Sequence, residues 1–387
     1  MKRYLIILMS ICAAVAVVAQ DSIPQRLDSL LRAPMFETTQ VGLMVYDLTG
    51  DSVVYKRNER QLMRPASCMK LVTAITALDR LGADYELRTQ VYYTGRVVDS
   101  TLVGNLYCVG GFDPMLSYED VAGLAAMVRD QLGIDSIRGQ IVADCSMKEP
   151  LDYGEGWCWD DDNPLLIPLS IGRKNVFLKT FAEETARLGI NLEQVCLTEG
   201  QRPSHARLVA TVGHSLSDVL MRMMKVSDNF YAESVFYQTA ASTGHRPAKA
   251  ADARGLTKKL IARLGLNADT YRIADGSGLS LYNYVTPELL VKLLRHAWRK
   301  ESMVRTLFDV LPIAGIDGTL KDRMKKTSAH ANVRAKTGTL TGISSLAGYC
   351  IAANGNEYCF AIINQGVMRN MDGKNFQNKV CQVLCDP

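Results

Sequence analysis

Short apolar runs near both ends of the chain have the length and the flanking turn residues of β-strands. Residues 41–47 and 52–55, joined around Leu48-Thr49-Gly50-Asp51, predict a hairpin. Residues 336–340, 345–352 and 358–364 predict three further strands. The pattern therefore predicts a five-stranded antiparallel sheet to which both ends of the chain contribute.

Apolar residues at helical spacing predict the helices that cover this sheet. The clearest stripe follows Pro65, ends at Gly82 and comprises Leu71, Val72, Ala74, Ile75, Ala77 and Leu78. Further helices are expected around residues 215–242, 251–265, 287–299 and 303–310, and a last one at 375–384. The sheet and the helices together indicate an α/β (α+β) fold.

Residues 84–206 have a different pattern, with short strand-like runs at 87–94, 96–98 and 106–109. A helix near residues 118–132 precedes another short run at 139–142. We interpret this stretch as an inserted, smaller α/β subdomain that interrupts a main domain formed by residues 20–83 and 207–387. Two units are also expected from length, because about 370 residues exceed one typical core.

The first 19 residues have the pattern of an export signal. Lys2 and Arg3 precede an apolar run over residues 5–18, which is too short and wrongly flanked for a membrane-spanning helix. We therefore expect a cleaved signal peptide and a periplasmic protein without a transmembrane anchor, with peripheral membrane contact left open. The formal net charge of +4 falls to +2 without Lys2 and Arg3, and no basic block indicates nucleic-acid binding.

Three short strings carry the candidate chemistry: Ser67-Cys68-Met69-Lys70, Ser227-Asp228-Asn229 and Lys336-Thr337-Gly338. Ser67 and Lys70 are three residues apart at the predicted helix start, so their side chains share one face. The free N–H groups and positive dipole end of a helix N-terminus favour a developing oxyanion. Lys70 can accept the serine proton if burial lowers its pKa. Taken alone, each string also fits a helix cap or a surface turn.

The order of the three strings resembles that of active-site serine enzymes of the penicillin-binding group. Longer strings narrow the resemblance to the D-alanyl-D-alanine carboxypeptidase/endopeptidase family of low-molecular-mass penicillin-binding proteins, specifically the class C type with an insertion between the first two motifs. These strings are Gly110-Gly111-Phe112-Asp113-Pro114, Gly156-Trp157-Cys158-Trp159-Asp160-Asp161, Asp275-Gly276-Ser277-Gly278-Leu279-Ser280 and Leu311-Pro312-Ile313-Ala314-Gly315-Ile316-Asp317-Gly318-Thr319-Leu320. The similarity spans nearly all of the mature chain, although Phe112 stands where the family usually has a small residue.

The resemblance implies a β-lactamase/penicillin-binding transpeptidase-like fold whose main domain is the penicillin-binding catalytic domain. It also implies a serine-type D-Ala-D-Ala carboxypeptidase, a DD-endopeptidase or both, acting on peptidoglycan stem peptides without a cofactor. β-Lactam antibiotics would acylate the same serine. In this family Ser67 would be the nucleophile, Lys70 its base and Ser227 a proton relay, while the Asn229 amide would hold the substrate peptide.

The third string would bind the end of the substrate. Lys336 and Thr337 offer a cation and a hydroxyl suited to a terminal carboxylate, and Gly338 permits close approach of a ligand. The backbone N–H groups of Ser67 and Thr339 would form the oxyanion hole, as the resemblance implies. No metal is expected, because the histidines lack zinc-ligand spacing.

Two other functions share this chemistry or this fold. A class A β-lactamase needs a carboxylate-positioned water, usually from a Glu-x-x-Leu-Asn string between the first two motifs. That string is absent, and the 160 positions from Ser67 to Ser227 are too many. A non-catalytic peptidoglycan-binding protein would keep the fold, but all the expected catalytic side chains are present.

The motifs do not distinguish the trimming of a pentapeptide end from the cutting of a cross-link, because both break a D-alanyl bond. Asp161, in a part of the insertion that approaches the cleft in similar proteins, is a candidate anion for the free amino group of a diaminopimelate side chain. The alternative is a solvated acidic turn over residues 160–164. Leu165 and Leu166 stand where family members place an aromatic.

Nine cysteines remain after the signal peptide, which removes Cys12, and this odd number leaves at least one unpaired. Cys350 and Cys359 flank Asn354-Gly355, and counting outward from a two-residue loop places them opposite each other. They are the best candidate for a disulfide in an oxidising compartment, with two buried free thiols as the alternative. Cys381 and Cys385, four apart on a predicted helix, favour one buried face over a bridge.

Overall fold

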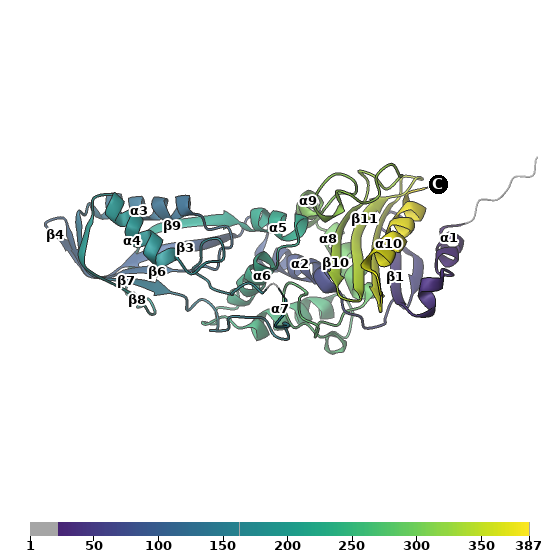
Figure 1. The fold of residues 1–387 in the computed structure, drawn as a ribbon, viewed down its shortest axis with the longest axis horizontal. Helices are drawn as coiled ribbons and strands as arrows, with labels where there is room; N and C mark the ends of the chain where they lie inside the picture. Colours follow the sequence, from purple (N-terminus) through teal and green to yellow (C-terminus); the bar gives the residue numbers. More distant parts are fainter. Residues whose placement is uncertain (1–21, 162, 387) are drawn as a thin grey trace, which may run out of the picture.

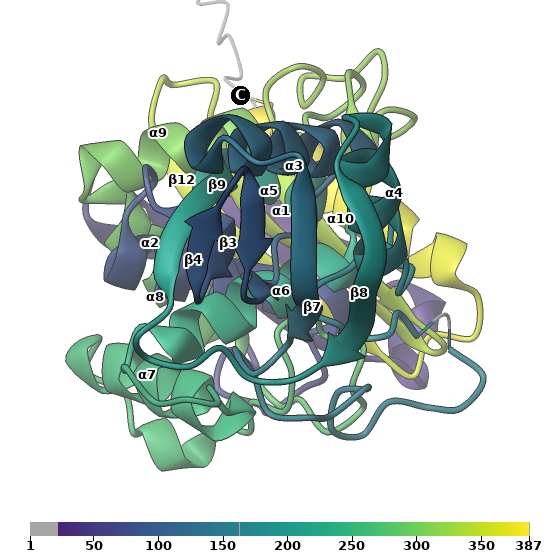
Figure 2. The ribbon, with the colours of Figure 1, turned by 90° about the vertical axis from the view of Figure 1, so that its left-hand side faces the viewer.

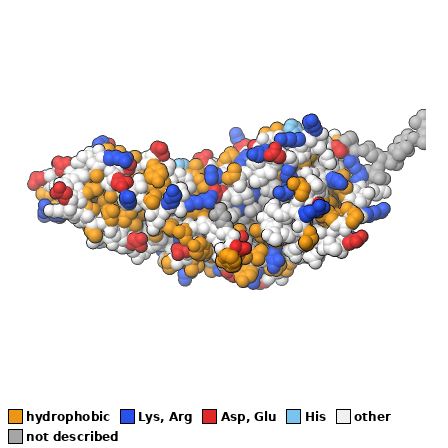
Figure 3. All heavy atoms as spheres, viewed as in Figure 1, with side chains coloured by type: hydrophobic (Ala, Val, Ile, Leu, Met, Phe, Trp, Pro, Cys, Tyr) orange, Lys and Arg blue, Asp and Glu red, His pale blue; other side chains and the backbone are white. Residues whose placement is uncertain are grey.

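The computed structural model describes residues 22–161 and 163–386 and shows an elongated molecule with a β-sheet at each end and helices between them (Figure 1). The predicted signal peptide, residues 1–19, lies outside the described residues. Within them, no helix has the length and hydropathy to cross a membrane. Figure 3 shows basic and acidic side chains interspersed along one face of the molecule.

The five-stranded antiparallel sheet predicted from both chain ends is confirmed, with strand order β10-β11-β12-β1-β2. Its strands are β1 (Gln40–Asp47), β2 (Ser52–Arg57), β10 (Arg334–Leu340), β11 (Ile343–Ile351) and β12 (Glu357–Gln365). β1 pairs with β12 from Gln40–Gln365 to Asp47–Tyr358, so the first strand of the chain joins the last. Every residue of β1 after Gln40 is buried, as expected for a strand covered on both faces.

Helices cover both faces of this sheet, and two apolar cores result. α8 packs against β12 and β1 on one face, whereas α10 packs against β11 on the other. The helices of this unit are α1 (Ile23–Leu30), α2 (Met69–Leu81), α5 (Leu216–Lys225), α6 (Asn229–Ala241), α7 (Ala250–Arg263), α8 (Pro287–Trp298), α9 (Glu301–Val310) and α10 (Asn370–Cys385). α2 is the helix predicted from the apolar stripe, and its residues are buried from Met69 to Leu78. It is capped by Gly82, whose φ of +85° favours glycine.

The stretch between α2 and α5 forms a second sheet of seven strands at the other end of the molecule (Figure 1). Its strands are β3 (Glu86–Tyr93), β4 (Arg96–Val98), β5 (Thr101–Val103), β6 (Leu106–Val109), β7 (Ser136–Asp144), β8 (Asn191–Glu199) and β9 (Arg207–Ser215). α3 (Tyr118–Leu132) and α4 (Phe177–Arg187) contact each other and, seen from this end in Figure 2, lie beside the sheet. A separate apolar core forms between them and the strands.

The last strand of this sheet lies beyond the expected boundary of the insertion. β9 pairs with β3 from Glu86–Ser215 to Tyr93–Arg207, so strand pairing continues past residue 206 to Ser215. We therefore propose a division of the chain at Ser215. The second unit then occupies one continuous stretch of the sequence.

Of the two alternatives for Cys350 and Cys359, the disulfide is wrong and the two buried free thiols are what the structure has; all nine cysteines among the described residues are free. β11 and β12 pair Cys350 with Tyr358 and Tyr349 with Cys359, which is one residue from the expected register. The loop has three residues, 353–355, because Ala352 N–H bonds Asn356 O and Gly355 takes a left-handed φ of +83°. A one-residue shift sends the two thiols to opposite faces of the sheet.

Candidate active site

The structure brings the first two predicted strings together around the amino group of Lys70. Lys70 Nζ lies 3.1 Å from Ser67 Oγ and donates hydrogen bonds to Asn229 Oδ1 at 2.7 Å and to the Ser277 carbonyl at 2.8 Å. The side chain is fully buried. A serine hydroxyl and an amine at this distance have the geometry of a nucleophile and its base.

Ser67 lies in a short 3₁₀ turn, Ala66–Cys68, which leads directly into α2. Ala66 has a φ of +47°, a conformation that non-glycine residues seldom adopt. The turn is held from two sides, because Ser345 Oγ donates to Pro65 O at 2.6 Å and Gly278 lies so close that a Cβ there would be 1.9 Å from Ala66 O. Such strain persists where the surroundings fix the backbone, as at active sites.

The second string forms the junction between α5 and α6. Ser227 has a φ of +65°, and Asp228 caps α6 by accepting from Phe230 N–H at 3.1 Å and Tyr231 N–H at 3.4 Å. The other oxygen of Asp228 binds two guanidinium groups, Arg173 Nη2 at 2.6 Å and Arg222 Nε at 3.0 Å. Asp228 therefore fixes the residues on either side of it, Ser227 and Asn229.

The third string lies on β10, against both of the others. Lys336 Nζ donates to Ser227 Oγ and to the Thr337 carbonyl, each at 2.8 Å. Gly338 is required by space, because a Cβ would lie 2.2 Å from Ser345 Oγ and 2.6 Å from Pro65 O. Thr337 is half-buried and Thr339 is exposed, so both can be reached from outside.

Burial changes the proton affinity of both lysines. Burial lowers the pKa of Lys70 to about 8, against the opposing attraction of Asp275 and Glu233. Burial, with repulsion from Lys70, lowers the pKa of Lys336 to about 7. A neutral amine beside Ser67 is therefore accessible near neutral pH, as a general base requires.

Glu233, Asp275 and Ser277 support the site, although the sequence analysis gave them no role. The buried Glu233 carboxylate accepts from Ser277 N–H at 2.8 Å, and burial raises its pKa to about 8. Asp275 accepts from Gly278 N–H at 2.8 Å, which shapes the loop that presents the Ser277 carbonyl to Lys70. A sequence signal existed for Glu233, because it is four residues from Asn229 on one helix and so shares its face.

Among the described residues, no hydrogen bond or ion pair links the Asp161 side chain to the three strings. Its carboxylate accepts from Cys158 N–H at 3.1 Å within its own turn and is half-buried. The same segment does reach the site through Trp157, whose Nε1–H donates to Asp275 Oδ2 at 2.9 Å. The insertion thus touches the loop that orients Lys70.

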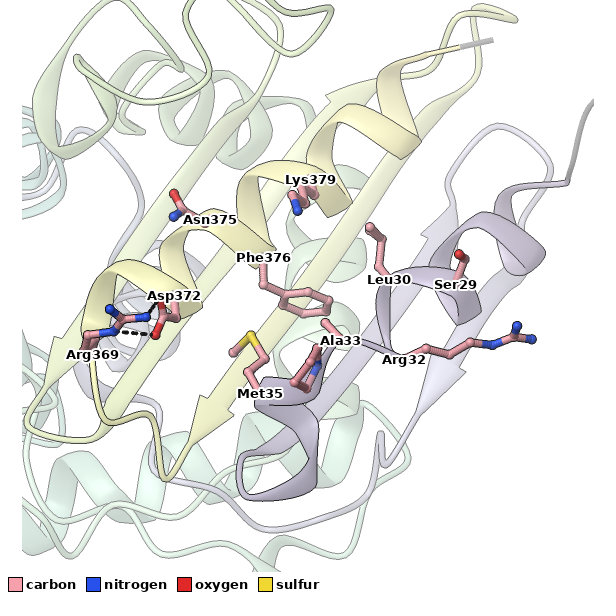
Figure 4. A pocket seen from close by; sticks show the side chains of 11 residues that line it. Ser29, Leu30, Arg32, Ala33, Met35, Arg369, Asp372, Asn375, Phe376 and Lys379 are labelled. Carbon is pink, nitrogen blue, oxygen red and sulfur yellow. Dashed lines mark hydrogen bonds and ion pairs between the residues drawn. The ribbon is translucent and has the colours of Figure 1, made fainter.

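A surface groove of about 780 Å³ lies elsewhere, between α1 and α10 (Figure 4). Leu30, Met35 and Phe376 form its apolar floor, and none of the motif residues lines it. Among residues 22–161 and 163–386, no cluster of three or more His, Cys, Asp or Glu side chains could hold a metal ion.

Two curated proteins are similar to this chain in sequence. The D-alanyl-D-alanine carboxypeptidase DacB of Haemophilus influenzae is 26% identical over 409 residues, which cover 84% of this chain and 85% of the relative. A D-alanyl-D-alanine carboxypeptidase of an Actinomadura species is 27% identical over 436 residues, covering 88% and 80%.

Solved structures show the same fold. The crystal structure of penicillin-binding protein 4 from Haemophilus influenzae superimposes with a TM-score of 0.83 at 24% identity, covering 92% of this chain and 97% of that one. A predatory peptidoglycan endopeptidase from Bdellovibrio bacteriovorus gives a TM-score of 0.58 at 18% identity, covering 89% and 93%. The penicillin-binding fold expected from the sequence is therefore confirmed.

The family assignment rests on the sequence rather than on the fold. A sequence model of one peptidase family matches residues 23–168 and 171–386, which is nearly all of the described chain and includes the three strings. The chain belongs to the D-Ala-D-Ala carboxypeptidase 3 (S13) family.

Proposed function

We propose that the protein is a serine-type D-Ala-D-Ala carboxypeptidase, a DD-endopeptidase or both, acting on peptidoglycan stem peptides after export to the periplasm. The observation that carries the proposal is the buried amine of Lys70, 3.1 Å from Ser67 Oγ, with its pKa lowered by burial to about 8. The names of the relatives support the substrate class.

In the proposed reaction, Ser67 Oγ attacks the carbonyl carbon of a D-alanyl peptide bond while its proton passes to Lys70 Nζ. The tetrahedral intermediate collapses to an acyl-serine, and the departing amine takes the proton held by Lys70, relayed through Ser227. Water then attacks the ester while Lys70 accepts a proton from it, and Lys70 passes this proton to Ser67 Oγ as the bond between the acyl carbon and Ser67 breaks. Backbone N–H groups of Ser67 and Thr339 stabilise the oxyanion, each contributing about 10²–10³ in rate.

The same serine would react with β-lactams, because their strained amide presents an equivalent carbonyl. A β-lactam complex is known for the penicillin-binding protein 4 of Haemophilus influenzae, to which this chain is similar in fold. The β-lactamase alternative requires rapid hydrolysis of the acyl-serine. Rapid turnover of nitrocefin, rather than one slow equivalent of product, would favour that alternative.

Replacement of Ser67 by alanine tests the assignment directly. A fluorescent penicillin should label the wild-type protein covalently and leave Ser67→Ala unlabelled, because the ester can form only on the serine oxygen. The melting temperature of the variant serves as the folding control. Labelling of Ser67→Ala, or a wild-type protein that neither labels nor cleaves muropeptides, would contradict the proposal and favour a non-catalytic binding protein.

A further inference from the structure

A second threonine hydroxyl lies against the third string. Thr337 Oγ1 donates a hydrogen bond to Thr319 Oγ1 at 2.8 Å, and Thr319 is exposed to solvent. Thr319 lies in a short 3₁₀ turn, Gly318–Leu320, in the connection between α9 and β10. The sequence analysis gave Thr319 no role.

The connection that carries Thr319 is fastened to the segment just before Ser227. Lys225 Nζ donates to Asp317 Oδ2 at 2.6 Å and to the Leu311 carbonyl at 2.7 Å. Gly318, with a φ of +54°, packs so closely that a Cβ would lie 2.6 Å from the Lys225 carbonyl. The end of α5 and the turn that bears Thr319 therefore form one packed unit.

The same connection is also fastened to β10. Ala335 N–H donates to Pro312 O at 3.0 Å, and Ala314 N–H donates to Val333 O at 2.9 Å. Because the segments that precede the second and the third strings both hold it, the Thr319 hydroxyl has a defined position beside Thr337. A hydroxyl held in place by backbone contacts loses little entropy when it binds a ligand.

The two side chains expected to bind the carboxylate, Lys336 and Thr337, have few protons free to donate. Lys336 Nζ already donates to Ser227 Oγ and to the Thr337 carbonyl, which leaves one of its three protons. Thr337 has a single proton, and it is directed at Thr319. A substrate carboxylate has two oxygens and about four acceptor positions, so it would need further donors.

Thr319 can supply one. When Thr337 turns its proton to a carboxylate, Thr319 can rotate and donate either to Thr337 Oγ1 or to the second carboxylate oxygen. We infer that Thr319 is a substrate-binding residue that, with Thr337, selects a free carboxylate at the end of the D-alanyl substrate. This inference rests on the proposed function and names the group that this part of the site recognises.

The test compares substrates with and without a free carboxylate. The second-order rate constant of acylation is measured for benzylpenicillin and for its methyl ester, and kcat/KM for a D-alanyl-D-alanine peptide and its C-terminal amide. Thr319→Val removes the hydroxyl at nearly constant volume, and Thr319→Ser is the matched control that keeps it. The ratio of acid to neutral substrate should fall about tenfold in Thr319→Val, the effect of losing one hydrogen bond to a charged group, and should stay within about twofold in Thr319→Ser.

Two results would overturn the inference. In the first, Thr319→Val keeps the wild-type ratio; in the second, it slows acid and neutral substrates equally, which is the mark of a merely structural role. The wild-type protein separates these failures from failure of the proposed function. If it is acylated by penicillin but cleaves no D-alanyl peptide, the penicillin pair still tests Thr319 while the proposed peptidase activity fails.

Discussion

The two buried lysines need different charge states for their proposed roles. Lys70 must be neutral to accept a proton from Ser67, whereas Lys336 must be charged to attract a carboxylate. Burial lowers the pKa of both, to about 8 and about 7. A carboxylate bound beside Lys336 would raise its pKa again by direct attraction, which leaves Lys70 as the amine that loses its proton.

The need for a neutral Lys70 predicts the pH dependence of acylation. Below about pH 7 Lys70 is protonated and cannot act as the base, so the rate should rise about tenfold per pH unit and level off above about pH 8. The measurement is the second-order rate constant of labelling by fluorescent penicillin from pH 5.5 to 9.5, with circular dichroism as the control for unfolding. A rate that does not change between pH 6 and 9 would contradict Lys70 as the base.

At the same scale, the sequence predicted which side chains would meet but not what surrounds them. Ser67 and Lys70 were predictable because one helical turn fixes their separation. The Ser277 carbonyl was not, because a backbone acceptor carries no sequence signal. The predicted pairing of Cys350 with Cys359 was also wrong. Asn354-Gly355 is compatible with a two-residue or a three-residue loop, and the pairing of the whole strands selects between them.

Among the elements, the turn between α5 and α6 is held in part by the insertion. Asp228, whose side chain is 2% exposed, receives Arg173 from the insertion and Arg222 from α5. A buried carboxylate that loses a guanidinium partner is left partly uncompensated. Arg173 is therefore expected to help hold Ser227 and Asn229 in place, although it is itself 38% exposed.

Arg173→Ala should lower the acylation rate constant about tenfold and the free energy of unfolding by only about 1 kcal/mol, because solvent weakens a partly exposed ion pair. The matched control is Arg263→Ala, which removes an arginine from Asp79, an aspartate whose side chain is 6% exposed near the C-terminal end of α2, about two helical turns beyond Lys70. Its acylation rate should stay within about twofold of wild type. Equal rates for the two variants would show that Arg173 does not position the second string.

The strands and helices themselves were largely predictable, because their apolar periodicities are strong. All five strands of the first sheet and the helix after Ser67 were expected within a few residues. β9 was missed as part of the second sheet. Its partner β3 is more than a hundred residues earlier, and long-range pairing leaves no local signal.

At the scale of the whole molecule, the insertion bears on which peptides the site accepts. Through the hydrogen bond from Trp157 to Asp275, the insertion contacts the loop that presents the Ser277 carbonyl to Lys70. It can therefore influence what binds near Lys70. We propose that the turn containing Asp161 helps to recognise a diaminopimelate amino group. The carboxylate now caps its own turn, and recognition would require it to exchange Cys158 N–H for the ligand.

Mass spectrometry of purified muropeptides measures this choice. Loss of one alanine from pentapeptides indicates carboxypeptidase activity, and conversion of dimers to monomers indicates endopeptidase activity. Asp161→Asn should reduce kcat/KM about threefold to tenfold for stems that carry a free diaminopimelate amino group, because one partly screened charge pair is lost. Stems in which that amine is acetylated are the control. Unchanged cleavage of the free-amine stem would remove Asp161 from recognition.

The pairing of β1 with β12 has a consequence for how this protein reaches its native state. Gln40 and Gln365 lie 325 residues apart in sequence, yet they belong to adjacent strands. The insertion, in contrast, pairs only strands from one continuous stretch, so it can fold while later residues are still being synthesised or translocated. The catalytic sheet must wait for β12, the last strand among the described residues, and contacts between residues so far apart in sequence form slowly. Until then Ser67 has neither β10 nor β11 beside it, so the chain acquires a reactive serine only when its final segment has arrived.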